Sequence, residues 1–279
     1  MIGALLRAGL AAARARLEAA AAAAEPEPDT AGGDDDEVDE PLWDGGRYMG
    51  ATWSPIHQGR VGGAIKPWAV VVHTTDMHPS TFGALRRAWT AKAGRGAGAH
   101  FLIGRTPAEG LHQLADVGRN GNHAGGPDHG WLDVRGRRVH PNSATVGIEV
   151  HCAGRVILHE GRWRTWTRQD GRLVPIGAPL PAAEVEPDPG HAGRGWHQPT
   201  AYQLAELEQL LRALPGCQVF VAAPPPALWG VTPNGAPPSW VPRVLIGGVP
   251  VVGHVTLDPA RKSDPGIPLA RALATWADR

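Results

Sequence analysis

The sequence predicts an α/β protein with a central mixed β-sheet flanked by helices. Three short apolar runs, at 69–75, 146–150 and 249–253, are rich in valine and have the length of buried strands. Two helical patterns, at 80–93 and 200–214, repeat apolar residues every three or four positions. Runs that are apolar on both faces occur in sheets covered by helices. We therefore expect one layered core, preceded by an N-terminal helix and an acidic linker.

Residues 1–24 predict an amphipathic helix, because leucines follow one stripe of an alanine-rich segment. Arg7, Arg14 and Arg16 interrupt any apolar stretch of the kind that a secretory signal needs, so we expect no signal peptide. Two roles for this helix stay open. It packs on its own domain or a sister chain, or it docks the protein onto a larger assembly.

Residues 25–46 predict a flexible linker, because they are rich in proline and glycine and hold nine acids between 25 and 40. The chain beyond residue 40 carries 24 basic and 17 acidic side chains. A basic body suits an anionic polymer, although surplus surface arginine explains the charge equally well. We assign 47–279 to one domain, and no apolar run reaches the roughly 18 residues of a membrane span.

The remaining elements follow in chain order. After the strand at 68–75, a helix at 80–93 has Ser80 as its candidate N-cap. Further strands are expected at 98–104, 110–117, 143–150 and 249–253, and helices at 200–214 and 269–277. We expect His100 to be a hydrogen-bonded residue of its strand. Cys152 and Cys217 are too few for a disulfide scaffold, and one bridge between them is left open.

Two segments are insertions, at about 155–199 and 216–248. The first contains a hairpin at 163–174 that turns at Asp170-Gly171. Its mixture of tryptophan and arginine fits a groove that stacks on sugar rings, and it fits packing over the sheet equally well. The second insertion carries no evident chemistry.

The predicted strands place ionisable groups where burial is costly unless those groups share a task. His73 and His254 end two strands, Glu149 lies within a third, and Lys262 and Asp264 follow His254 in one loop. Two imidazoles and a carboxylate suit zinc, with a fourth position left for water. A glutamate and a lysine nearby would supply the proton transfer and the electrostatic stabilisation of a hydrolysis. Taken singly, each of these residues has an ordinary structural explanation.

Together, these motifs resemble a known family. His73 at a strand end, Gly147-Ile148-Glu149, and His254 followed by the loop 261–266 are similar to the zinc-dependent N-acetylmuramoyl-L-alanine amidases. This type 2 amidase family includes phage lysozyme-like amidases and peptidoglycan recognition proteins, and the resemblance spans about 68–273. It implies zinc held by His73, His254 and Asp264. It also implies that Glu149 passes the proton of water to the leaving amine and that Lys262 stabilises the developing oxyanion.

The resemblance also implies the substrate, peptidoglycan, cut between N-acetylmuramic acid and the L-alanine of the stem peptide. His123 lies in Gly121-Asn122-His123-Ala124-Gly125, which is similar to the family's His-Ala-Gly loop with Asn122 at a common tryptophan position. We assign His123 to substrate contact, and a structural role in the loop is an equal alternative. Ala99 stands where some members use a tyrosine, so the tyrosine-using variant is not expected. Val255 and Ala260 depart from the usual zinc loop and put only its local geometry in doubt.

Other interpretations remain. The chain could be a muropeptide-binding module without activity, which has no need of the full set of five residues, or an amidase that recycles small muropeptides. Other histidines compete as ligands, namely His78, His112, His129, His140, His151, His159, His191 and His197.

We expect peptidoglycan as the partner, with no nucleic acid. Without a signal peptide, the enzyme would be made in the cytoplasm. As a phage-type, endolysin-like enzyme it would reach the wall after lysis; the other routes are dedicated export, or carriage on a phage or tail-like particle attached through residues 1–24.

Overall fold

A computed structural model describes residues 42–56, 61–91, 98–125, 130–222, 229–233, 243–259 and 262–277. The chain divides into two units, residues 1–40 and 41–279, and all described residues belong to the second unit. The predicted N-terminal helix at 1–24 and most of the acidic linker therefore lie outside the described residues. Within the described part of the chain, no helix is long and apolar enough to cross a membrane.

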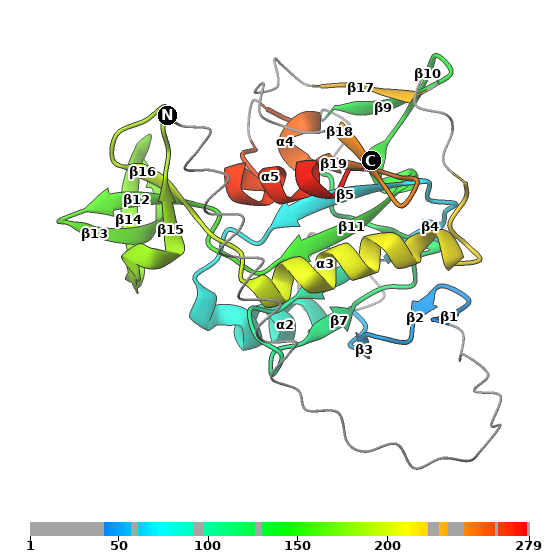
Figure 1. The fold of residues 1–279 in the computed structure, drawn as a ribbon, viewed down its shortest axis with the longest axis horizontal. Helices are drawn as coiled ribbons and strands as arrows, with labels where there is room; N and C mark the ends of the chain where they lie inside the picture. The colour runs from blue at the N-terminus through cyan, green and yellow to red at the C-terminus, as the bar shows by residue number, and fades with distance from the viewer. Residues whose placement is uncertain are drawn as a thin grey trace, which may run out of the picture. The chain divides into compact units, whose positions relative to one another are not determined.

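A seven-stranded sheet forms the centre of the second unit (Figure 1). Its strands, in spatial order, are β18 (Arg243–Ile246), β19 (Val249–Gly253), β5 (Ala69–Thr74), β11 (Thr145–Val150), β6 (Phe101–Ile103), β7 (Leu111–Gln113) and β3 (Thr52–Trp53). The four strands from β19 to β6 are parallel to one another, and β18 and β7 run antiparallel to their neighbours β19 and β6. These directions confirm the predicted mixed sheet. The predicted burial of its central strands is also confirmed, because every residue of β5 and nearly every residue of β11 is buried.

Successive side chains of β5 point to opposite faces of the sheet, and the two faces contact different parts of the protein. Val70 and Val72 pack in one cluster with leucines of two helices, α3 (Ala201–Ala213) and α5 (Gly266–Trp276). Figure 1 shows both helices on the same face of the sheet. Val71 belongs to a different cluster on the opposite face. His73 shares the face of Val71, so the polar site lies on the side of the sheet that α3 does not cover.

Smaller elements complete the body. Two helices, α2 (Phe82–Thr90) and α4 (His254–Leu257), follow β5 and β19 in the chain. Short strands form two pairs and one three-stranded sheet: β1 (Trp43–Asp44) with β2 (Arg47–Tyr48), β4 (Val61–Ala64) with β8 (Arg119–Gly121), and β9 (Trp131–Val134) between β10 (Arg137–Val139) and β17 (Trp229–Thr232). They add residues to the hydrophobic core: Trp43 and Tyr48 join the cluster of Val70 and Val72, and Leu132 joins the cluster of Val71.

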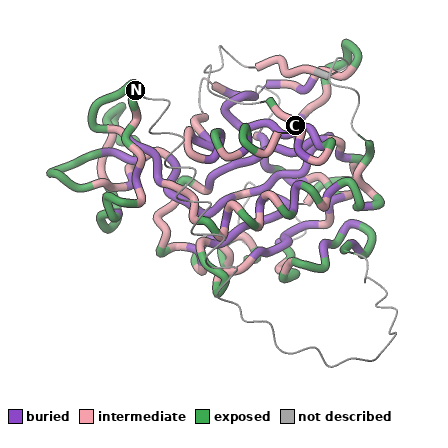
Figure 2. The backbone as a smooth tube through the Cα atoms, viewed as in Figure 1, coloured by how far each residue is buried: buried purple, intermediate pink, exposed green. Residues whose placement is uncertain are grey.

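The first insertion folds as a sheet of its own, which we call the insertion sheet (Figure 1). Its strands, in spatial order, are β14 (Arg172–Leu180), β13 (Arg162–Gln169), β12 (Arg155–His159), β16 (Arg194–His197) and β15 (Val185–Pro187). The predicted hairpin is confirmed, since Asp170 and Gly171 take the positive φ values, 48° and 77°, of a tight two-residue turn. Trp163 packs against the small core of this sheet, and the hairpin tip is exposed (Figure 2).

The helix α3 forms as predicted, and its first turn ties it to the sheet. Thr200 and Gln203 make a reciprocal capping box that satisfies two backbone N–H groups at the helix start. The amide of Gln203 also donates to the carbonyl oxygens of Ile103 and His151, at 3.2 and 3.0 Å. The helix start is therefore fixed to the ends of β6 and β11, and β11 carries Glu149.

Several expectations differ from the structure in detail. The predicted linker runs to residue 46, but Trp43 is buried and its indole Nε1 donates to the Ala213 carbonyl at 2.8 Å, so the body extends into that segment. Ser80 lies in a 3-10 turn before α2, where the His78 side chain accepts a hydrogen bond from its backbone N–H. The second insertion supplies β18 to the central sheet. Cys152 and Cys217 are both buried and free.

Candidate metal centre

Three side chains meet at the ends of β5 and β19. The Nδ1 atoms of His73 and His254 lie 3.0 Å apart, and each lies 3.2 Å from Oδ2 of Asp264. All three residues are almost fully buried. This is the one group of the described residues whose ligand atoms converge closely enough to hold a metal ion.

The spacing of the three atoms fits a tetrahedral metal centre. Ligands about 2.0–2.1 Å from a tetrahedral zinc ion stand about 3.3 Å from one another, which is close to the observed distances. Burial and the neighbouring His254 lower the pKa of His73 to about 4, so its imidazole is neutral at neutral pH. Burial alone would raise the pKa of Asp264, but His254 and His73 hold it below its usual range. The group therefore presents the neutral imidazole of His73, the imidazole of His254 and the carboxylate of Asp264, which are the side-chain types of a catalytic zinc site.

The loop that follows β19 places Asp264 because of two local features. Gly253 ends the strand, and a Cβ atom at this position would overlap with the ring of Pro265. The backbone N–H of Val255 donates to the Asp264 carbonyl at 2.7 Å. The missing side chain of Gly253 thus lets the loop fold back over the strand end, and Asp264 comes within reach of both histidines.

Glu149 lies beside this group on the adjacent strand. It is the register partner of His73 in the parallel pair β11 and β5, so the two side chains share a face. Its pKa is raised well above the usual value by burial and by the nearby Asp264 and Asp76, and is lowered by Lys262. Oε2 of Glu149 is buried and has no hydrogen-bond partner among the described residues. A carboxyl of this kind is suited to hold and release a proton.

Lys262 lies in the same loop as Asp264, with its backbone N–H donating to the Asp258 carbonyl at 2.9 Å. Its charge acts on Glu149, on His73 and on Asp76. The structure thus brings together five residues that the sequence singled out, drawn from three strand ends far apart in the chain.

His123 lies behind His73, with both ring nitrogens hydrogen-bonded inside the protein. Its Nδ1 is 3.0 Å from Nε2 of His73, and its Nε2 is 3.1 Å from the hydroxyl of Thr145. That hydroxyl donates to the Pro141 carbonyl at 2.7 Å, so it accepts from His123. Nδ1 of His123 therefore accepts a hydrogen bond from the Nε2–H of His73, and this leaves Nδ1 of His73 free to bind a metal. In this position His123 supports a candidate ligand, and substrate contact by His123 stays a prediction.

His100 is a hydrogen-bonded residue of the sheet. Its Nδ1 accepts from the Gly147 N–H at 2.9 Å, and its Nε2 lies 2.7 Å from the Arg119 carbonyl. Burial lowers the pKa of His100 to about 4. The competing histidines that the structure describes take no part in the converging group.

Asp76 is a further carboxylate near the site that sequence reasoning did not single out. Its Oδ1 accepts from the Thr74 hydroxyl at 2.9 Å. Desolvation of the carboxyl and the nearby Asp264 raise the pKa of Asp76 above its usual value, and solvent moderates this shift because the residue as a whole is exposed. Asp76 follows β5 by two residues, and that position is the one signal in the sequence that could have identified it.

Comparisons with known proteins identify the family of the chain. The family model described as N-acetylmuramoyl-L-alanine amidase matches residues 63–267. The chain belongs to this family. None of the curated proteins matches the chain.

Two solved structures are similar to the chain. AmpDh3 from Pseudomonas aeruginosa is 19% identical with a TM-score of 0.43, and the match covers 78% of this chain and 62% of AmpDh3. AmiD from E. coli, solved with anhydro-N-acetylmuramic acid-L-Ala-D-gamma-Glu-L-Lys, is 17% identical with a TM-score of 0.41, and the match covers 77% of this chain and 58% of AmiD. The chain thus spans about three fifths of the length of each of these structures.

Proposed function

We propose that the protein is a zinc-dependent amidase that hydrolyses the bond between N-acetylmuramic acid and the L-alanine of the peptidoglycan stem peptide. The observation that carries the proposal is the convergence of His73, His254 and Asp264, with Glu149 and Lys262 beside them, in a member of this family. Zinc is the metal that best suits two imidazoles and a carboxylate. When bound there, zinc supplies a Lewis acid that strengthens the electrophile and activates water.

The protein's own residues supply the rest of the reaction. Glu149 accepts a proton from the attacking water and delivers it to the leaving nitrogen of L-alanine. Its raised pKa suits both steps, because the group holds a proton at near-neutral pH more readily than an ordinary glutamate does. Lys262 stabilises the negative charge that develops on the carbonyl oxygen. His123 holds the ring of His73 in one tautomer throughout.

The proposed substrates are muramoyl peptides. The muropeptide in the AmiD complex contains L-Ala-D-gamma-Glu-L-Lys. Linkage through the γ-carboxyl leaves the α-carboxylate of the glutamate free, two residues from the amide that is cut. We propose the same class of peptide for this chain.

The test is hydrolysis of purified sacculi followed by mass spectrometry of the products. Release of stem peptides with a free L-alanine amino group, abolished by a chelator and by Glu149→Gln, supports the proposal. Tight binding of muropeptides with no release would instead identify a binding module of the same fold. Release from whole sacculi separates a wall-directed enzyme from one confined to small, recycled muropeptides.

The route to the wall and any attachment to a particle through residues 1–24 stay predictions. Expression of the chain with and without residues 1–40, followed by location of both forms in the host, would test them.

A further inference from the structure

A hollow of about 280 Å³ lies beside Lys262, on the side where the insertion sheet meets the body. Asp76 and Lys262 line it from loops that follow β5 and β19. Arg155 and Trp166 line it from β12 and β13 of the insertion sheet. The hollow therefore joins a proposed catalytic residue to side chains that the insertion supplies.

The insertion sheet holds the Arg155 side of this hollow in place by several contacts. Arg155 is the register partner of Trp196 in the pair β12 and β16, and its guanidinium carbon lies 4.8 Å from the centre of the Trp196 ring. The indole Nε1 of Trp166 donates to the Arg155 carbonyl at 2.9 Å. Backbone pairing, ring stacking and this hydrogen bond together hold Arg155 in place.

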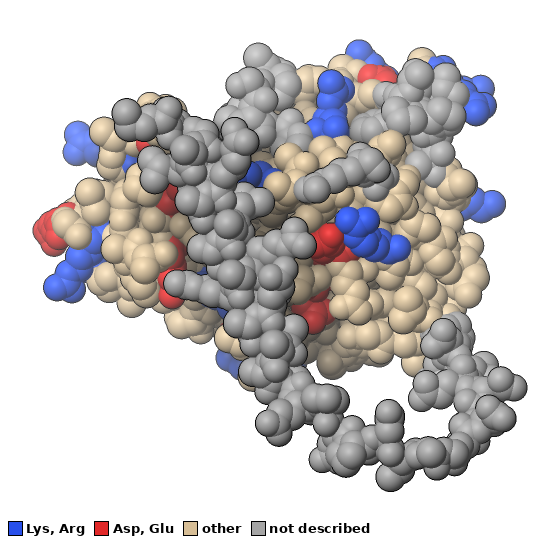
Figure 3. Space-filling model, viewed as in Figure 1, with Lys and Arg blue, Asp and Glu red and all other residues tan. Residues whose placement is uncertain are grey.

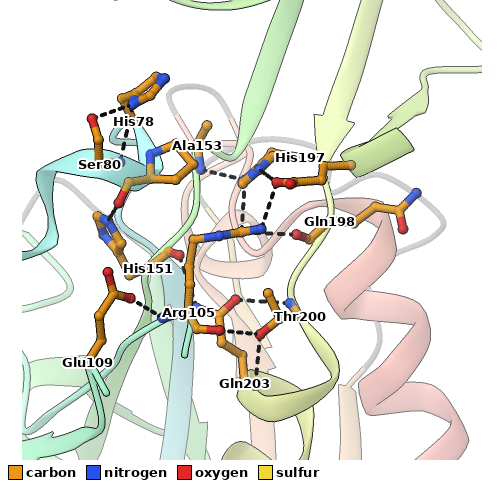
Figure 4. A network of polar contacts seen from close by, with 12 residues as sticks. His78, Ser80, Arg105, Glu109, His151, Ala153, His197, Gln198, Thr200 and Gln203 are labelled. Atoms are coloured by element: carbon orange, nitrogen blue, oxygen red, sulfur yellow. Dashed lines mark hydrogen bonds and ion pairs between the residues drawn. The ribbon is translucent and has the colours of Figure 1, made fainter. Parts of the chain in front are cut away.

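A polar network fixes the same sheet to the body (Figure 4). Arg105, just beyond β6, forms an ion pair with Glu184 at 2.8 Å. His197 donates from Nε2 to Glu184 at 3.1 Å and accepts at Nδ1 from the Ala153 N–H at 3.2 Å. Ala153 also lines the hollow. Direct contacts therefore fix the insertion sheet to the segments that follow β6 and β11.

The charges of the hollow favour an anion. Arg155 and Lys262 bring two cations against the single carboxylate of Asp76, which already accepts a hydrogen bond from Thr74. Nε of Arg155 is buried and donates to no group in the described part of the protein. A buried donor without a partner is costly, and a guanidinium is well shaped to bind a carboxylate. Figure 3 shows both basic and acidic side chains at the exposed end of the insertion sheet, so the charge of the hollow comes from its own lining.

We propose that this hollow is a substrate subsite completed by the insertion sheet, in which Arg155 binds a free carboxylate of the peptide near the bond that is cut. The inference rests on the proposed function, because it takes the substrate to be a muramoyl peptide. The α-carboxylate of a γ-linked glutamate lies two residues beyond that bond. Two extended residues span about 7 Å, which suits a hollow that begins at Lys262. Arg155 is thus a residue that determines specificity.

Two matched muropeptides test the subsite, one with the glutamate α-carboxylate and one with the α-carboxamide. We expect the wild-type zinc-loaded protein to prefer the carboxylate form by about tenfold in kcat/KM, as is typical for a hydrogen bond to a charged group. Arg155→Met should bring the ratio of the two rates close to one. Arg162→Met is the matched control, since Arg162 is exposed on the same sheet and should keep the wild-type ratio.

The ratio separates the role of Arg155 from a loss of folding, because a damaged protein would lose both substrates together. An equal fall for both, or a wild type that does not distinguish them, overturns the inference. The two muropeptides are also titrated into the wild-type protein. Tighter binding of the carboxylate form without any hydrolysis would refute the proposed function and still support the subsite.

Discussion

Replacement of His123 by alanine should weaken zinc binding without touching any ligand. His123 is buried, and its Nδ1 accepts a hydrogen bond from the Nε2–H of His73 at 3.0 Å. With the imidazole removed, the Nε2–H of His73 faces a cavity, and the tautomer that frees Nδ1 is no longer favoured. His73 can then turn or bind a proton at Nδ1, and either change competes with the metal.

The size of this effect follows from the position of His123 in the hydrogen-bond chain. Loss of the group that orients a metal-binding histidine costs about 10–100-fold in metal affinity, which is about 1.4–2.7 kcal/mol. We expect a loss in the upper half of this range, because the chain of hydrogen bonds continues from His123 to the Thr145 hydroxyl and on to the Pro141 carbonyl. Each donor in it has an acceptor, so the orientation of His123 is fixed.

Competition with a chromophoric chelator measures the zinc affinity of the wild type and of His123→Ala. His112→Ala is the matched control, since His112 is also a buried histidine and bonds to Ser54 and to the Glu109 carbonyl, away from the metal group. The control should lose stability without a change in zinc affinity. Equal affinities for wild type and His123→Ala, or an equal loss in His112→Ala, would refute the role that we give to His123.

Three further variants test the same site. Thr145→Val removes the hydroxyl that fixes the proton of His123, and the chelator assay should show a smaller loss of zinc affinity, of about tenfold. Asp76→Asn removes a charge that raises the pKa of Glu149, so the acid limb of the pH–rate profile should move to lower pH. An acid limb that stays in place or moves to higher pH would contradict this effect of Asp76 on Glu149. Glu149→Gln should lower kcat by about a hundredfold or more. Because burial raises the pKa of Glu149, its contribution to folding is present at low pH and lost as pH rises through that pKa, so the metal-free Gln variant should melt above the wild type at neutral pH.

Much of the fold could be predicted because burial leaves a strong mark on a sequence. The valine run of β5 is buried at every position, and Thr200 with Gln203 marks the start of α3 by a local hydrogen-bond pattern. The metal group could be predicted because its residues end strands and follow the order of a known family. The valine run and the capping pair are patterns of neighbouring residues, so they can be read from the sequence without knowledge of tertiary contacts.

The remaining features depend on contacts between distant segments. Trp43 joins the core through the carbonyl of Ala213, far along the chain. The strand β18 has mixed exposure and is fixed by its pairing with β19. The place of His123 behind His73 depends on Gly147, where any Cβ atom would overlap with the His123 ring. Nothing in the spacing of these residues predicts that they meet.

Metal content measured together with muropeptide hydrolysis decides whether the protein is a zinc amidase. The wild type should bind one zinc ion per chain, and His73→Ala, His254→Ala and Asp264→Ala should each lose both zinc and hydrolysis. Chelation should abolish hydrolysis in the wild type, and added zinc should restore it. Hydrolysis that persists in a metal-free sample, or full zinc content in the three variants, would rule out catalysis by zinc at this group.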